Sequence, residues 1–289
     1  MWIGYALGAA VFAGLTAILA KAGVRNTPST LATALRTVVV LVGACVMVLV
    51  VGSGSSIVDL SPRTWLFLVL SGAATGASWL CYFRALQLGP VSKVAVIDKS
   101  SIVLTVLLAV VLLGETDDLA ARLIGIALIG VGTYLMIERR PDPATPARGP
   151  WLLYALGSAV FAALTALFGK VGIAEVESNL GTAIRTVVVL VMAWILVAMK
   201  REGRALRTIP RRELWFIGLS GAATGASWLC FWKAMQDGPA SVVVSIDKLS
   251  IVVTVVLATL IFREYQSRRA LVGLGLIIIG TLLMLIGVV

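Results

Sequence analysis

The chain has 289 residues, of which 60% are hydrophobic and only 13% are charged, and its mean hydropathy is +1.02. A soluble domain keeps roughly a quarter of its residues charged, so the composition excludes a soluble globular protein. The net charge of +10 does not indicate nucleic-acid binding, because the sequence has no helix-turn-helix, zinc-ligand or basic-aromatic sheet pattern.

The apolar residues are grouped in blocks of about 20, the length that crosses a hydrocarbon layer of about 30 Å as a helix. Glycines scattered inside continuous apolar runs favour helices over the alternating pattern of a β-barrel. The first block lacks a charged leader and is too long for a signal sequence, so it is expected to be a retained span. We predict an all-α membrane protein with ten transmembrane helices, at residues 2–22, 30–51, 63–84, 91–113, 120–138, 151–170, 179–199, 212–233, 240–262 and 268–288.

The sequence is an internal duplication in which residue i matches residue i+149 over most of its length. The segment SGAATGASWLC occurs at Ser71–Cys81 and is repeated without change at Ser220–Cys230. Proline and mixed charges between the copies are typical of an interfacial connection. We therefore expect a first five-helix repeat at residues 1–138, a linker at 139–150 and a second five-helix repeat at 151–289.

Five spans per repeat is an odd number, so the second repeat enters the membrane from the opposite side, giving a 5+5 inverted-topology repeat. Sixteen of the 24 lysines and arginines fall in loops on the side of the linker, against four on the other side. The positive-inside rule then predicts a multi-pass protein of a bacterial-type inner membrane, with the linker in the cytoplasm and both termini outside.

Ionisable residues inside the predicted spans are the first candidates for a functional site. They are Arg36, Asp98 and Lys99 in the first repeat, and Arg185, Asp247 and Lys248 in the second. Each arginine and its aspartate are predicted at a matching depth of roughly 10 Å, so we expect them to pair. Two interpretations stay open for each cluster, and one cluster could be structural while the other is functional. The lysines could extend to the headgroups while the pairs only hold helices together, or the groups line a cavity and contact substrate or a coupling proton.

Two further patterns recur in both repeats. Small residues spaced four apart predict close helix packing, or a moving seam, at Gly72, Gly76, Gly221 and Gly225. Trp79 and Trp228 follow them and are either core aromatics or platforms that stack on a substrate.

SGAATGASWLC, LGPVSKVAVIDKSSIV and the Gly-Glu that closes the fourth span resemble the EamA-type transporters of the drug/metabolite transporter superfamily. The IDKxS segment is most similar to compact bacterial members with one five-helix unit, and the chain looks like two such units fused. The resemblance implies a ten-helix fold with a central cavity, functional as a monomer, that exports small metabolites or drugs without ATP hydrolysis. Ten-helix relatives are usually described with cytoplasmic termini, so the external termini expected here depart from that pattern.

Each intramembrane cluster contains two cations and one carboxylate, which predicts a positive cavity. We therefore expect a secondary-active or facilitative transporter that exports a small anionic or zwitterionic metabolite. The alternatives are a lipid translocator, or a small-drug exporter in which the charged pairs are structural. An enzyme is not expected, because the chain has no histidine and no recognisable catalytic motif. No catalytic residue, metal or cofactor is predicted, and the expected partners are a small-molecule substrate and membrane lipid.

Overall fold

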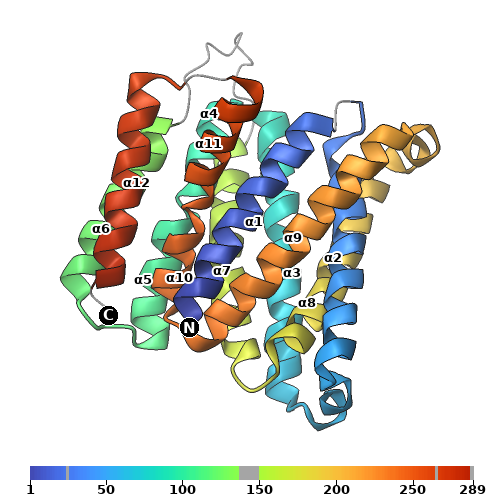
Figure 1. The fold of residues 1–289 in the computed structure, drawn as a ribbon, viewed down its shortest axis with the longest axis horizontal. Coiled ribbons are helices and arrows are strands. Elements are labelled where there is room, and N and C mark those ends of the chain that lie inside the picture. The colour runs from blue at the N-terminus through green and yellow to red at the C-terminus, as the bar shows by residue number, and fades with distance from the viewer. Residues whose placement is uncertain (24–25, 137–149, 264–265, 287–289) are drawn as a thin grey trace.

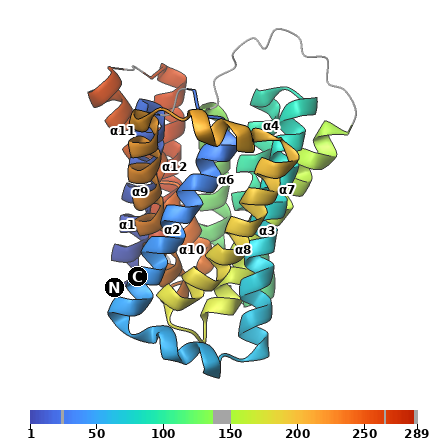
Figure 2. The same cartoon turned by 90° about the vertical axis from the view of Figure 1, so that its right-hand side faces the viewer.

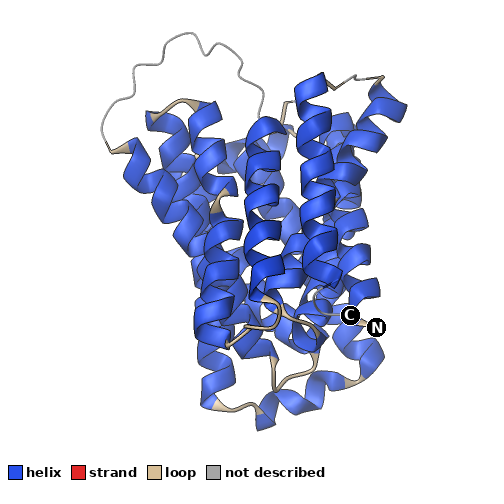
Figure 3. Cartoon of the chain, turned by 90° about the vertical axis from the view of Figure 1, so that its left-hand side faces the viewer, coloured by secondary structure: helices blue, strands red, loops and turns tan. Residues whose placement is uncertain are grey.

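A computed structural model describes residues 1–23, 26–136, 150–263 and 266–286, and every regular element within these ranges is helical (Figure 3). Ten segments in this part of the chain are long and apolar enough to cross a membrane. Eight of them are single helices: α1 (Trp2–Gly23), α2 (Ser29–Val51), α3 (Pro62–Leu88), α6 (Leu119–Met136), α7 (Trp151–Ile173), α8 (Ser178–Met199), α9 (Arg211–Asp237) and α12 (Arg268–Ile286). The predicted all-α class with ten spans in a 5+5 arrangement is confirmed.

The fourth and ninth spans are broken, whereas the sequence predicted continuous helices at 91–113 and 240–262. The fourth consists of α4 (Val91–Lys99) and α5 (Ser101–Leu113), and the ninth of α10 (Ala240–Asp247) and α11 (Ser250–Phe262). At the second break the N–H groups of Lys248 and Leu249 donate to carbonyls three residues back, which is a 3₁₀ turn. Such a turn inside a helix often marks a hinge. The first break follows directly on the pair Asp98-Lys99, and the second begins within the pair Asp247-Lys248.

The two repeats have opposite orientations in the bundle. The ends marked N and C lie at one end of the molecule in Figure 1, which we call the terminal face, and α6 ends and α7 begins at the other, the linker face. The short 3₁₀ helices η1 (Ser53–Asp59) and η2 (Glu202–Thr208) lie on opposite faces (Figure 2). This arrangement follows from an odd number of spans per repeat.

The repeats interlock instead of forming separate bundles. The most extensive packing is between α3 and α7, α1 and α9, α6 and α12, and α2 and α8, and each of these pairs joins one repeat to the other. Glycines make two further crossings close. A Cβ atom on Gly72 of α3 would lie 2.7 Å from Val188 Cβ of α8, and one on Gly221 of α9 would lie 2.8 Å from Val39 Cβ of α2. Hydrogen at these positions is therefore what allows the repeats to approach.

The other two glycines of the motif differ from each other. A Cβ on Gly76 would overlap the side chain of Met192, but one on Gly225 would make an ordinary contact of 3.5 Å with Val40 Cα. Three of the four positions thus form a tight seam, and Gly225 does not.

We expect Gly72→Ala to destabilise the protein by roughly 1–3 kcal/mol, because the added methyl group forces α3 away from α8. Gly43→Ala in α2 is the matched control, since no atom lies within 4 Å of a Cβ built there. The measurement is the thermal unfolding of each purified variant in the same detergent. Equal melting temperatures for the two variants would contradict the close crossing.

Two glutamates fix the starts of the second and seventh spans. Glu213 of α9 accepts hydrogen bonds from the backbone N–H groups of Asn26 and Thr27, just before α2. On the terminal face, Glu177 accepts from the N–H groups of Asn179 and Leu180, at the start of α8, and from the hydroxyl of Ser53 in η1. Burial raises the pKa of Glu177, but the hydrogen bonds outweigh that effect and hold its pKa below the ordinary value of 4.5.

Replacing Glu177 by alanine should cost about 1 kcal/mol at neutral pH, the usual loss for a helix N-cap. Because the folded-state pKa is depressed, this stabilisation is complete above the ordinary pKa and is lost as the pH falls through the folded value. The difference in melting temperature between wild type and Glu177→Ala should therefore narrow below about pH 4.5. Glu175→Ala is the control, because Glu175 is exposed and makes no hydrogen bond among the described residues. A difference that widens on acidification would refute this role.

Candidate functional site

A cavity of about 310 Å³ lies between the repeats. Most of its wall is aromatic or hydroxyl-bearing, and it contains one cation and one carboxylate. Its lining residues come from α1, α3, α7, α8, α9 and α10, and are Ala13, Thr75, Trp79, Thr165, Arg185, Ser227, Trp228, Phe231, Trp232 and Asp247. The structure thus brings four of the eight predicted site residues, Trp79, Arg185, Trp228 and Asp247, to one space.

Arg185 is held by side chains of α3 and α9 and is only 2% exposed. Its guanidinium carbon lies 4.2 Å from the ring centroid of Trp232 and 5.2 Å from that of Trp228. Its Nε and Nη2 donate to the hydroxyls of Ser71 and Thr75 on α3, at 3.3 and 3.1 Å. Cation–π contact and hydroxyl acceptors replace the water that the cation would otherwise require.

The predicted Arg36–Asp98 and Arg185–Asp247 ion pairs are wrong. No nitrogen of either arginine lies within 4.0 Å of its predicted carboxylate; all four residues are among those described. Arg36 donates instead to Thr33 on its own helix, and Arg185 is satisfied by hydroxyls and rings. Equal depth is a necessary condition for pairing, but the direction in which each side chain leaves its helix decides the partner.

The two aspartates have different surroundings although the sequence around them is duplicated. Asp98 accepts a hydrogen bond of 2.8 Å from Ser158 of α7, and it is not part of the cavity wall. Residue 158 corresponds to Ala9 in the other repeat, so Asp247 has no such anchor. The contact described for Asp247 is with the adjacent Lys248, at 3.8 Å. Divergence at one position therefore leaves Asp247 facing the cavity.

The lysines lie at the helix breaks, outside the described cavity wall. Each contacts the aspartate that precedes it, at 3.9 Å for Lys99 and 3.8 Å for Lys248. The sequence predicted two separate clusters, each with an arginine. The structure instead leaves each lysine beside its own aspartate and outside the cavity wall, whereas Arg185 and Asp247 share that wall and Arg36 lies outside it.

A carboxylate closes the terminal face. Glu115, just beyond α5, accepts hydrogen bonds from the backbone N–H groups of Ala240 and Ser241, at 2.6 and 3.0 Å, and from the Ser241 hydroxyl. It therefore binds the start of α10, where the helix dipole favours a negative charge. Arg122 of α6, 1% exposed, donates to the Glu115 carboxylate at 3.2 Å. From the sequence, Glu115 was noted only as the residue that closes the fourth span, and this role was missed.

The ends of α7 and α9 are tied together on the same face. Lys170 Nζ donates to the carbonyls of Met235 and Gly238, and the Gln236 amide donates to the carbonyls of Ile173 and Val176. On the linker face, Gln87, the counterpart of Gln236, is exposed and accepts a hydrogen bond from Arg84 within its own helix. The two glutamines, at equivalent positions, therefore make different contacts.

Packing of the broken spans shows the same difference. On the terminal face α5 packs against α10, and residues Ala240–Ile246 are all buried. The equivalent pair on the linker face, α4 and α11, has at most marginal contact, and the side chains of Lys93 and Lys99 are exposed. The bundle is thus closed at the terminal face and less tightly packed at the linker face.

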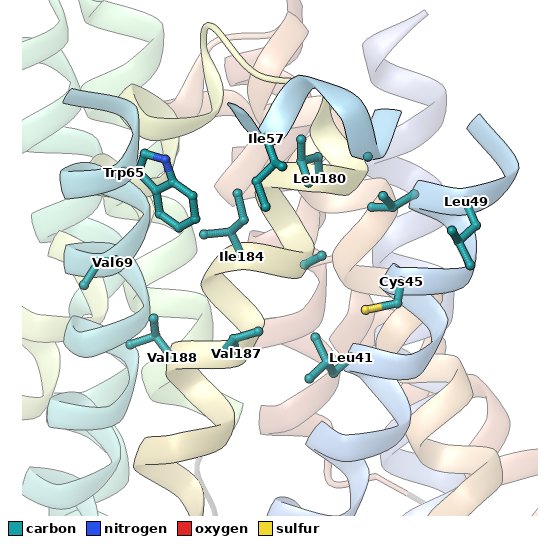
Figure 4. A pocket seen from close by; sticks show the side chains of 13 residues that line it. Leu41, Cys45, Leu49, Ile57, Trp65, Val69, Leu180, Ile184, Val187 and Val188 are labelled. Carbon is teal, nitrogen blue, oxygen red and sulfur yellow. The ribbon is translucent and has the colours of Figure 1, made fainter. Parts of the chain in front are cut away.

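A larger hollow of about 510 Å³ lies on the outside of the bundle between α2 and α3, with α8 as its floor (Figure 4). Trp65 and Val69 of α3 face Leu41 and Leu49 of α2 across it, and its lining is almost entirely apolar. It contains none of the predicted site residues.

A bundle of ten apolar spans in two inverted repeats, around a small polar cavity, defines a membrane transport protein. The chain belongs to the EamA-like transporter family, which it matches over residues 1–138 and 149–286. A Sinorhizobium protein described as an uncharacterized transporter in the cobO 3′ region is 47% identical over 135 residues. These make up 95% of that relative but 47% of this chain, so the relative is about one repeat long. A protein of known crystal structure shares the fold with a TM-score of 0.76 at 20% identity, over 97% of this chain and 95% of its own.

We expect Glu115→Gln to loosen the terminal face, because a neutral amide binds the start of α10 more weakly than a carboxylate. The measurement is the rate at which a membrane-impermeant thiol reagent, applied at that face, modifies Thr165→Cys in a cysteine-free background. The rate should rise about tenfold, the equivalent of one charge-assisted hydrogen bond. Glu175→Gln is the control, since its carboxylate lies near the same face without a described hydrogen bond. Equal rates in both variants would argue against a latch.

Proposed function

We propose that this protein moves a small zwitterionic or anionic metabolite across the membrane by alternating access, as a secondary-active or facilitative exporter. The observation that carries the proposal is the presence of Arg185 and Asp247 in the wall of the same cavity without an ion pair between them. A carboxylate and an ammonium group on one molecule would complement these two charges. The volume of about 310 Å³ is at the small end of ligand pockets, which suits a metabolite rather than a large drug.

The aromatic wall is expected to supply most of the contact area. Trp79, Trp228 and Phe231 border the cavity together with Trp232, which already stacks on Arg185. Rings of this kind bind apolar or planar groups and exclude water, which strengthens the electrostatic contacts beside them.

Alternation between two states is supported by the asymmetry of the faces. On the terminal face, Glu115, Lys170 and Gln236 hold helix ends together. On the linker face, the corresponding helices α4 and α11 have at most marginal contact with each other. If the terminal face opened and the linker face closed, the cavity would open towards the terminal face, with the broken spans as hinges. With the linker in the cytoplasm, as the loop charges predict, the present state would take substrate from the cytoplasm.

A lipid translocator is the second function considered from the sequence. A headgroup would need a polar path open to the bilayer. The hollow between α2 and α3 is open but apolar, and the side chains of α8 that form its floor do not include Arg185. No observation on the described residues favours this function over a soluble metabolite.

The test is uptake into liposomes by wild type, Arg185→Gln, Asp247→Asn and Arg36→Gln, with labelled zwitterionic, anionic and quaternary ammonium compounds. We expect wild type to carry a zwitterion or anion. The uptake rate of each cavity variant should be lower by tenfold or more, which is the effect of removing about one charge-assisted hydrogen bond. Arg36→Gln is the matched control, because Arg36 is the counterpart of Arg185 in the first repeat and lies outside the cavity wall. Lys99→Met and Lys248→Met show whether the lysines at the breaks also contact substrate.

Transport of the quaternary ammonium compound alone, unchanged in the cavity variants, would overturn the proposal. Loss of transport in Arg36→Gln equal to that in Arg185→Gln would remove the assignment of the cavity as the binding site.

A further inference from the structure

A shallow surface pocket on the outer side of α9, which we call the α9 notch, combines apolar side chains with one arginine. Its volume is about 340 Å³, and its lining residues follow one face of the helix at Arg211, Leu214, Trp215, Gly218 and Leu219. Trp215 is 74% exposed and Leu219 49%, which within a transmembrane span means exposure to lipid. A Cβ built on Gly218 has no atom within 4 Å, so the floor of the notch is open space and not a helix contact.

The upper end of this notch lies among arginines on the linker face. Five are exposed around η2 and at the start of α9, and none has an ion pair or a side-chain hydrogen bond among the described residues: Arg201, Arg204, Arg207, Arg211 and Arg212. The neighbouring Glu213 cannot neutralise them, because it is buried and bound to Asn26 and Thr27. The cluster is therefore a net positive surface at the membrane boundary.

The other repeat shows that the fold does not require this feature. The position equivalent to Arg211 is Pro62 at the start of α3, where the corresponding face continues through Trp65 and Leu66. Both repeats therefore have an apolar stripe and one arginine at the second position of the helix (Arg63 and Arg212), but only the second repeat has an arginine at the first position, in the lining of the notch.

We propose that the α9 notch binds one anionic phospholipid, with an acyl chain along Leu214, Trp215 and Gly218 and the phosphate at Arg211. Guanidinium groups bind phosphate oxygens with two parallel hydrogen bonds, and basic clusters beside apolar spans favour anionic lipid. A second copy of the chain is a poor occupant, because a symmetric contact would bring two arginine clusters together. The proposal does not depend on the identity of the transported substrate.

The test is native mass spectrometry of purified protein with phosphatidylglycerol or phosphatidylcholine of the same acyl chains. Wild type should retain phosphatidylglycerol preferentially, and Arg211→Gln should reduce that retention about fivefold, the contribution of one arginine near a lipid surface. Gly218→Phe keeps every charge but fills the notch, and it should reduce retention as well. Arg268→Gln is the matched control, because Arg268 is likewise exposed and is the first residue of its helix on the same face.

Three results would overturn the proposal. The first is equal retention of the two lipids by wild type. The second is an equal loss in Arg211→Gln and Arg268→Gln, which would show attraction by overall charge. The third is a result that leaves no role for the acyl chain. It would be either full retention of phosphatidylglycerol by Gly218→Phe, or displacement of the lipid by glycerol phosphate at the same concentration.

Discussion

A guanidinium group buried at the centre of a membrane protein must be solvated entirely by protein, and the arrangement around Arg185 depends on this requirement. Leaving such a cation without partners in a low-dielectric region costs several kcal/mol. Ser71 and Thr75 reach it because Gly72 lets α3 approach α8, and Trp232 lies beside it because Gly169 of α7 has no side chain in the way. The close crossings of the repeats and the polar groups around the cavity therefore depend on the same glycine positions.

The duplicated halves are related in sequence but not equal in structure. Arg185 is enclosed by rings and hydroxyls from α3 and α9, whereas its counterpart Arg36 bonds only to Thr33 on its own helix. The serine that anchors Asp98 is an alanine in the other repeat. Small differences of this kind place one arginine and one aspartate of the second repeat in the cavity wall, while their counterparts in the first repeat lie outside it.

Most of the fold could be predicted from the sequence, because the length of an apolar block and the count of spans follow directly from the thickness of a bilayer. The duplication with five spans, an odd number, in each repeat also required opposite orientations of the repeats. The site was predicted only in part. Asp247 and Trp228 were identified because charges and aromatics in apolar spans are conspicuous, but depth along a helix does not give the direction of a side chain. The Arg185–Asp247 pair was therefore wrong.

Other groups carried weaker signals. Trp232 differs from its counterpart Phe83, so divergence between the copies could have identified it. The role of Glu115 depends on the position of α10, whose first residue is 125 residues further along the chain, so no local sequence pattern predicts it. The breaks in the fourth and ninth spans are similar: the Asp-Lys pairs mark their place, but apolar flanks on both sides are indistinguishable from a continuous helix.

The interlocked packing of the repeats has a consequence for how such a chain is assembled. Each repeat presents its glycine-lined faces to the other, and the pairs α3–α7, α1–α9 and α6–α12 all join different repeats. Each repeat therefore buries its largest packing surfaces against the other repeat. Two separate copies of one repeat would meet the same requirement, and joining the two in one chain lets each half change its sequence without the other.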